Sequence, residues 1–256
     1  MSAVSPVHPV RPVRAVVVGG ASGIGAAIAA RHRTAGDELV VWDRAEADVV
    51  CDIADPAQVE RATAETIDAI GPPTVVTITA GIGHSGMLLD APADDWDRVL
   101  GVNAKGVWLA MRALARPMID AAAGPDGDRE PRSIVATTSI SGRLVDRSMG
   151  LYCASKSALD AVIRTAAMEW APAVRVNGIA PGVTDTPMLG RAPRDAGWLA
   201  GVVGRTAMGR LGTPDDVADA VAAIHAMPWL TGQIVECDGG LGLESPIDPL
   251  GPRRRP

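Results

Sequence analysis

The chain has 256 residues, of which 47% are hydrophobic and 21% are charged. This balance is typical of a globular protein and excludes a disordered or fibrous chain, and the length suits one large domain. The formal net charge of −6 opposes binding to nucleic acid or to an anionic membrane, so we expect neither as a partner. No apolar run approaches the roughly 18 residues of a membrane span and no export signal is visible, so a cytoplasmic location is expected.

Several residue types that carry chemistry are scarce. Cys51, Cys153 and Cys237 lie far apart and form no CxxC pair, which argues against a disulfide framework and a thiolate zinc site. The four histidines have no metal-ligand spacing, so no metal is expected. The chain has no phenylalanine, one tyrosine and only two lysines among its 24 Lys and Arg residues. The core must therefore be aliphatic, and the few positions that keep Tyr or Lys are informative.

Short apolar runs alternate with longer helical patterns along most of the chain. The Pro-rich segment 1–14 is predicted to be a flexible lead, and the polar segment 244–256 a solvated tail. In chain order we predict a strand at 15–18, a helix at 26–35, strand 39–42, helix 56–70, strand 74–79, helix 96–115, strand 133–138, helix 155–170, strand 174–179, helix 214–226 and strand 233–237.

This alternation predicts an α/β fold with a doubly wound parallel sheet of seven strands and helices on both faces. Continuously apolar strands indicate a sheet that is buried on both sides, because each right-handed crossover lays its helix against the sheet. We expect a single domain over residues 15–243. Ligands of such sheets bind at the carboxyl ends of the strands, so the loops that follow the strands are the candidate site.

A glycine-rich loop follows the first predicted strand and opens the first predicted helix. Gly19, Gly23 and Gly25 lie where glycines allow backbone N–H groups to approach the pyrophosphate of a dinucleotide. The glycines could also serve a tight turn alone. The spacing does not match a P-loop, because no Lys follows to reach a terminal phosphate.

Two carboxylates indicate which dinucleotide binds. Asp43 ends the second predicted strand, 18 residues after Gly25, where a carboxylate accepts hydrogen bonds from ribose hydroxyls. It would repel a 2′-phosphate, and Ser22 carries no charge to bind one, so NAD is favoured over NADP. Asp52 could receive the adenine amino group, although a role in a turn or a helix cap is equally compatible with its position.

Tyr152 and Lys156 are four residues apart at the start of a predicted helix and therefore share one face of it. A free phenol has a pKa of about 10, too high for a base at neutral pH, but an adjacent ammonium favours the phenolate. The one tyrosine and one of the two lysines are thus predicted to act as an acid–base pair.

These motifs resemble those of the short-chain dehydrogenase/reductase family of NAD(P)-dependent oxidoreductases over residues 15–243. The family's TGxxxGxG corresponds to residues 18–25 and its YxxxK to residues 152–156. Its catalytic serine, 13 residues before the tyrosine, corresponds to Ser139, and its helical asparagine to Asn103. The resemblance implies a Rossmann-type fold and also a homotetramer.

The resemblance further implies a role for each residue. Ser139 would bond the substrate oxygen, Tyr152 would exchange a proton with it, Lys156 would lower the pKa of Tyr152 and hold the nicotinamide ribose, and Asn103 would anchor a proton-relay water. The segment 175–188 resembles the family's PG motif, whose threonine, here Thr186, binds the carboxamide. The cofactor-binding residues so implied are Gly19, Ser22, Gly23, Ile24, Gly25, Asp43, Asp52, Ile53, Ala80, Gly81, Tyr152, Lys156, Pro181, Gly182, Thr184 and Thr186.

The chain departs from the family pattern at two places. Val18 replaces the usual threonine before the glycines, and Ile78-Thr79-Ala80-Gly81 replaces the family's NNAG. A hydroxyl and two amides that normally hold the glycine loop and the central strand are lost, which bears on loop rigidity and cofactor affinity.

Substrate specificity is expected from residues 143–149 and 188–208, whose composition favours a mostly apolar ligand. We expect His84 to be a solvated loop residue and Cys153 a packing thiol. The sequence therefore predicts an NAD-dependent enzyme that interconverts a secondary alcohol and a ketone. The alternatives are a 3-oxoacyl-thioester reductase that uses NADPH and a nucleotide-binding regulator without catalysis.

Overall fold

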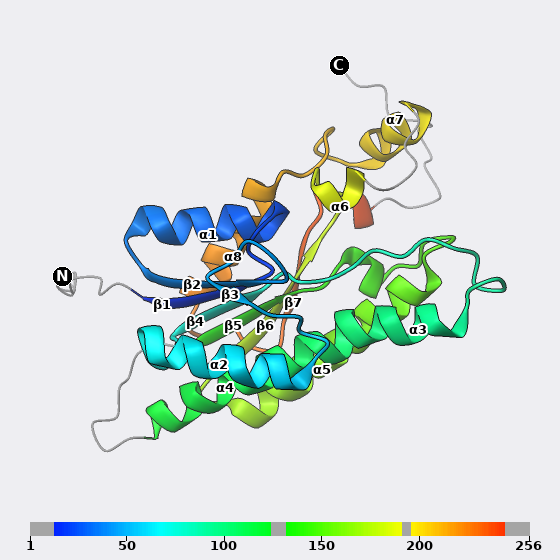
Figure 1. Ribbon diagram of the computed structural model, residues 1–256. Helices are drawn as coiled ribbons and strands as arrows, with labels where there is room; N and C mark the ends of the chain where they lie inside the picture. The colour runs from blue at the N-terminus through cyan, green and yellow to red at the C-terminus, as the bar shows by residue number, and fades with distance from the viewer. Residues whose placement is uncertain (1–12, 124–131, 191–195, 244–256) are drawn as a thin grey trace, which may run out of the picture.

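The computed structural model describes residues 13–123, 132–190 and 196–243 (Figure 1). The predicted tail lies outside these ranges, as does the predicted lead except for its last two residues. Seven parallel strands form one sheet in the order β3-β2-β1-β4-β5-β6-β7. The strands are β1 (Arg14–Val18), β2 (Glu38–Asp43), β3 (Val49–Val50), β4 (Val75–Ile78), β5 (Ser133–Thr137), β6 (Arg175–Pro181) and β7 (Ile234–Cys237).

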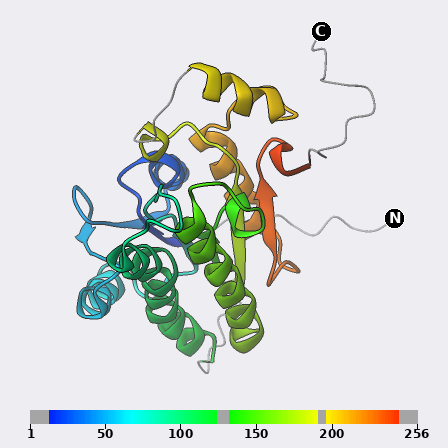
Figure 2. The same ribbon diagram turned by 90° about the vertical axis from the view of Figure 1, so that its right-hand side faces the viewer.

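Helices cover both faces of the sheet, as predicted for a doubly wound fold (Figures 1 and 2). Helices α1 and α8 pack on one face, and α2, α4 and α5 pack on the other. The helices are α1 (Gly23–Ala35), α2 (Pro56–Ile70), α3 (Ala93–Leu100), α4 (Val107–Ala122), α5 (Gly150–Trp170), α6 (Pro187–Gly190), α7 (Ala196–Arg205) and α8 (Pro214–Ala226), with a π-helical turn η1 (Gly101–Gly106) and short 3₁₀ turns η2 (Ile140–Gly142) and η3 (Leu241–Leu243).

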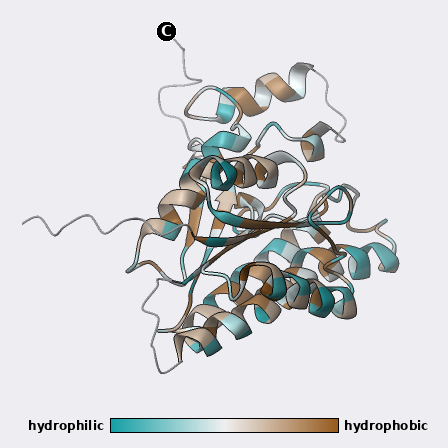
Figure 3. Ribbon diagram, turned by 60° about the vertical axis from the view of Figure 1, so that its left-hand side comes forward, coloured by the Kyte–Doolittle hydropathy of each residue, from teal (hydrophilic) through white to brown (hydrophobic). Residues whose placement is uncertain are grey.

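Each central strand contributes to two aliphatic cores. Val16 and Val18 of β1 face the α2–α4–α5 side, whereas Val17 faces α1 and α8, because successive side chains of a strand point to opposite faces. Figure 3 shows hydrophobic residues along the strands and on the inner sides of the helices. Among the described residues, no helix combines the length and hydropathy needed to cross a bilayer.

The structure corrects three predicted elements. The seventh strand is the two-residue β3, too short to show a periodicity in the sequence. The helix predicted at 96–115 begins at Ala93, continues to Ala122 and contains the π-helical turn η1, which no hydrophobic period indicates. The helix predicted at 155–170 begins five residues earlier, at Gly150, and its first turn already buries Leu151 and Cys153.

Candidate active site

The predicted site residues lie at the carboxyl end of the sheet, below α6 and α7 (Figure 1). The strand order reverses between β1 and β4, and in open α/β sheets such a switch point opens the crevice in which a ligand binds. The glycine loop follows β1 on one side of this point, and the catalytic residues follow β5 and begin α5 on the other.

The glycine loop is held so tightly that side chains have no room. A Cβ at Gly19, where φ is +85°, would lie 2.5 Å from the Ala80 nitrogen, and one at Gly25 would lie 2.1 Å from the Gly19 carbonyl oxygen. Among the described groups, the Ser22 hydroxyl caps none of the first-turn N–H groups of α1. The first turn of α1 therefore begins without a side-chain cap at the positive end of the helix dipole, an arrangement that fits a pyrophosphate.

The Thr79 hydroxyl ties the glycine loop to the end of β4. Its Oγ1 donates to the Gly19 carbonyl oxygen, 2.9 Å away, and lies 3.1 Å from that of Val18. The main-chain N–H groups of Thr79 and Ala80 also donate to the Val18 carbonyl oxygen, at 2.7 and 3.1 Å. The hydroxyl that Val18 lacks is thus supplied from the neighbouring strand. In the sequence, Thr79 is noted only because it replaces an asparagine of the family motif. Its position directly after a strand was the one signal that its hydroxyl could bond to the glycine loop.

Asp43 lies at the end of β2, directly over the glycine loop. Its carboxylate accepts hydrogen bonds from the N–H groups of Ala21, at 3.0 Å, and Arg44, at 2.7 Å. The Asp52 carboxylate accepts from the Ala54 N–H at 2.9 Å, which is the turn role. The Ile53 side chain is buried in the core, so only its backbone can face an adenine. Cofactor contacts by these three residues stay predictions.

Tyr152 and Ser139 are hydrogen-bonded through their side chains, and the Ser139 Oγ also accepts the Ser141 N–H at 3.1 Å. Burial raises the pKa of Tyr152, the bond from Ser139 opposes this rise, and Asp146 adds to it. The helix and the strand end therefore place the two predicted catalytic hydroxyls in contact. They do not by themselves make the phenol acidic.

Lys156 is buried and points toward the end of β5. Its Nζ donates to the Thr137 carbonyl oxygen at 2.9 Å and lies 5.7 Å from the centroid of the Tyr152 ring. Burial lowers the pKa of Lys156 to about 8, because charge is poorly solvated there. Lys156 is not among the groups that shift the pKa of Tyr152 in this structure, where burial raises it. The expected lowering by Lys156 therefore stays a prediction for the enzyme with cofactor bound.

Asn103 joins the loop after β4 to α5 from within the π-helical turn. Its Oδ1 accepts the Ile82 N–H at 2.8 Å, and its Nδ2 donates to the Ile82 carbonyl oxygen at 2.9 Å and to the Ser155 Oγ at 3.1 Å. A Cβ at Gly81 would lie 3.2 Å from the Asn103 Oδ1 and 3.6 Å from the Lys156 Nζ. Gly81 therefore allows the amide and the ammonium to approach one loop. The water-anchoring role of Asn103 stays a prediction.

The residues after β6 close the opposite wall of the site. Pro181 ends β6, and a Cβ at Gly182 would lie 2.8 Å from the Asp238 Cα, so this passage is narrow. The Thr184 Oγ1 donates to the Gly182 carbonyl oxygen at 3.2 Å. The Thr186 side chain reaches the glycine loop, since a Cβ at Gly23 would lie 3.4 Å from its Cγ2. The residues after β6 thus lie next to the glycine loop at the end of the sheet.

The expectation of a solvated His84 is wrong. Its side chain is only 6% exposed, and its Nε2 lies 3.3 Å from the Asp95 Oδ2. The ring also lies against its own loop, since a Cβ at Gly86 would be 3.4 Å from the His84 Cε1. Cys153 is buried, as expected of a packing thiol.

Comparisons with known proteins agree with this geometry. A family model described as enoyl-(acyl carrier protein) reductase matches residues 19–242. Galactitol 2-dehydrogenase of Rhizobium johnstonii is 35% identical over 252 residues, covering 88% of this chain and 93% of that protein. The (3R)-3-hydroxyacyl-CoA dehydrogenase of Canis lupus familiaris is 38% identical over 173 residues, covering 66% of this chain and 63% of that protein.

Among solved structures, the ligand-free aldohexose dehydrogenase of Thermoplasma acidophilum matches with a TM-score of 0.83 at 27% identity, covering 93% of this chain and 97% of that one. The chain therefore belongs to the short-chain dehydrogenase/reductase family. It is an oxidoreductase that acts on CH–OH groups with a nicotinamide cofactor.

Proposed function

We propose that this enzyme interconverts a secondary alcohol and a ketone with NAD(H), using Tyr152 as the acid–base group. The observation that carries the proposal is the contact of the Tyr152 and Ser139 hydroxyls, with Lys156 one helical turn further along α5. Ser139 holds the substrate oxygen, and Tyr152 removes its proton during oxidation or returns it during reduction. The bound nicotinamide accepts or supplies the hydride at the adjacent carbon.

The preference for NAD over NADP rests on Asp43. Its carboxylate lies at the end of β2 against the backbone of the glycine loop, where a ribose hydroxyl would find an acceptor and a 2′-phosphate would meet a negative charge. The N–H groups that open α1 would hold the pyrophosphate, and Lys156 and Thr186 would hold the nicotinamide half.

A mostly apolar substrate is supported by the rim of the site. Three segments meet there: the loop after β4, the loop before α5, and the cover formed by α6, α7 and the residues after them. Gly83 lies below Met188, since a Cβ at Gly83 would be 3.8 Å from the Met188 Cγ, and Leu88 lies against Gly150. The large apolar side chains exposed on these segments are Met87, Leu88, Leu89, Val145, Met188, Trp198, Leu199 and Met208. Such a rim favours a ligand with apolar surface to bury.

We further propose that the enzyme is a cytoplasmic homotetramer, as its resemblance to the family implies. A mass in solution equal to that of one chain would contradict this assembly.

The test is a panel of cyclic and acyclic ketones, matched by polyol-derived ketones, assayed with NADH and with NADPH. We expect turnover of apolar ketones with NADH, and loss of about 10²–10⁴-fold in kcat for Tyr152→Phe with cofactor affinity retained. Asp43→Ser should shift the preference toward NADPH. Full activity of Tyr152→Phe would overturn the assigned role. A preference for NADPH and acyl thioesters would favour the reductase alternative, and cofactor binding without turnover would favour a regulator.

A further inference from the structure

Three consecutive residues at the end of β5 each contact one side chain of α5. Lys156 donates to the Thr137 carbonyl oxygen, and Tyr152 bonds to the Ser139 hydroxyl. Between these two lies Thr138, whose hydroxyl donates to the Ile179 carbonyl oxygen at 3.3 Å and lies near the carboxyl group of Asp160. Because Tyr152, Lys156 and Asp160 are spaced by four residues, they form one stripe along the helix. Asp160 is thus the third member of the row that contains the catalytic pair.

The structure encloses Asp160 as closely as it encloses Lys156. The exposed fractions of the two residues are 6% and 3%. The turn η2 closes over the carboxylate, since a Cβ at Gly142 would lie 2.8 Å from the Asp160 Oδ2. Among the described residues, the Asp160 Oδ1 has no hydrogen-bond partner. A buried carboxylate with one unbonded oxygen costs stability, so its presence calls for a counter-charge or a function.

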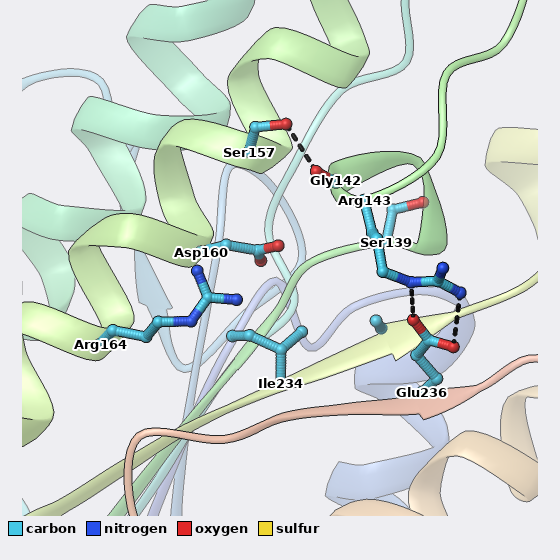
Figure 4. A pocket seen from close by; sticks show the side chains of 9 residues that line it. Ser139, Gly142, Arg143, Ser157, Asp160, Arg164, Ile234 and Glu236 are labelled. Carbon is cyan, nitrogen blue, oxygen red and sulfur yellow. Dashed lines mark hydrogen bonds and ion pairs between the residues drawn. The ribbon is translucent and has the colours of Figure 1, made fainter.

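The surroundings of Asp160 form a cavity of about 310 Å³ behind Ser139 (Figure 4). Asp160 and Arg164 extend into it from α5, and the Arg143–Glu236 ion pair lies on the opposite wall. Arg164 is an exposed residue on the helix, and its charge lowers the pKa of Asp160 while burial raises it. The carboxylate therefore lies between two cations of its own helix, one buried and one exposed.

Few polar or titratable groups lie around Lys156. On α5 they are Tyr152 and Asp160, whereas the end of β5 offers the Thr137 carbonyl, the π-helical turn offers Asn103 and the loop after β4 offers the glycine backbone at Gly81. Among the described residues, Asp160 is the one carboxylate that acts on Lys156, and it raises the pKa that burial lowers.

We propose that Asp160 is a positioning residue for the catalytic pair: its buried carboxylate, one helical turn beyond Lys156, keeps Lys156 protonated in the working enzyme. This inference rests on the proposed function of Lys156. It assigns to Asp160 the role of counter-charge for Lys156, a role that is part of neither the glycine motif nor the Tyr–Lys motif.

The direct test follows the ionisation of Lys156 by NMR. The chain contains two lysines, so [¹³Cε]lysine labelling gives two signals, and Lys105→Arg assigns them. We expect Lys156 to titrate near pH 8 in the natural chain, and about one pH unit lower in Asp160→Asn, which keeps the shape and removes the charge. Arg164 is not among the groups that shift the pKa of Lys156, so Arg164→Gln should leave the titration in place. Ser157→Ala, which changes the same cavity wall without changing its charge, should leave it in place.

The same variants separate an electrostatic role from a structural one. The basic limb of the pH profile of kcat/KM should move with the Lys156 titration in Asp160→Asn. A uniform loss of activity with an unmoved limb, or a Lys156 signal that titrates as in the natural chain, would overturn the proposal. Should Asp160→Asn fail to fold, a Lys156 signal that stays in place in Asp160→Ser, which also removes the charge, would overturn it. The titration needs no substrate, so it decides this inference even if the proposed reaction is wrong.

Discussion

The two ends of the parallel sheet treat their polar groups in opposite ways. At the amino end, the Arg175 guanidinium donates to the carbonyl oxygens of Leu230, at 2.9 Å, and His225, at 2.7 Å. The His225 ring lies between the hydroxyls of Thr77 and Ser133, 3.0 Å from each. Most of these polar groups are bonded within the protein and close that end, although the Arg175 Nε is buried without a partner among the described residues.

At the carboxyl end, polar groups are buried but kept available. The Ser22 side chain does not cap the first turn of α1, and one oxygen of the Asp160 carboxylate has no partner among the described residues. Burial raises the pKa of Tyr152, because a phenolate would be poorly solvated there. The comparison shows how one fold separates stability from function: substitutions at the closed end should cost stability, and substitutions at the open end should cost binding and catalysis.

The largest effect on stability is expected from pH at the closed end. Burial lowers the pKa of His225 to about 3, whereas an unfolded histidine titrates near 6.5. Between these values the unfolded chain binds the additional proton, so stability falls as pH decreases below about 6.5 and is restored above it. By about pH 4.5 we expect His225 alone to account for a loss of about 3 kcal/mol.

Urea unfolding at pH 7.5 and 4.5 checks this prediction, with His225→Gln as the matched variant. The variant should be less stable at the higher pH and should lose less stability on acidification. Equal acid losses in the two chains would show that the ring titrates normally, and the closed end would then not be sealed as described.

A smaller effect, and one on binding, is expected at the open end. Thr79→Val removes the hydroxyl that holds the Gly19 carbonyl while keeping the side-chain volume, and a buried neutral hydrogen bond is worth about 1 kcal/mol. We expect the Kd for NADH to rise about 3- to 10-fold, with little change in urea stability and in the KM for the ketone.

Fluorescence titration with NADH measures the change, and Thr79→Ser is the control because it retains the hydroxyl. If Val and Ser at position 79 bind NADH equally well, the hydroxyl does not hold the loop. A loss of stability that matches the loss of binding would remove the distinction between the two ends.

The sequence predicted the parts of the molecule that depend on local spacing. The glycine pattern, the apolar strands and the interval between Tyr152 and Lys156 are all short-range signals, and they located the sheet and the site. The contacts of Thr79, Asp160 and His84 depend on chain segments that only the fold brings together. The π-helical turn around Asn103 likewise has no hydrophobic period that marks it.

The pKa of Tyr152 is where local and tertiary effects oppose each other. Adjacent Lys156 predicts an acidic phenol, whereas the surrounding protein removes the phenolate from water and raises the pKa. In the proposed function, the positive charge of the oxidised nicotinamide adds to that of Lys156, and together they lower the pKa of Tyr152.

The ionisation of Tyr152 in the presence of cofactor tests this account most directly. Since the chain has one tyrosine, [¹³Cζ]tyrosine labelling gives one signal whose pH dependence reports that hydroxyl alone. We predict ionisation above the ordinary pKa of about 10 in the free chain and below it with NAD⁺ bound, with the downward shift lost in Lys156→Met. A signal that titrates at the same pH with and without NAD⁺ would contradict the account.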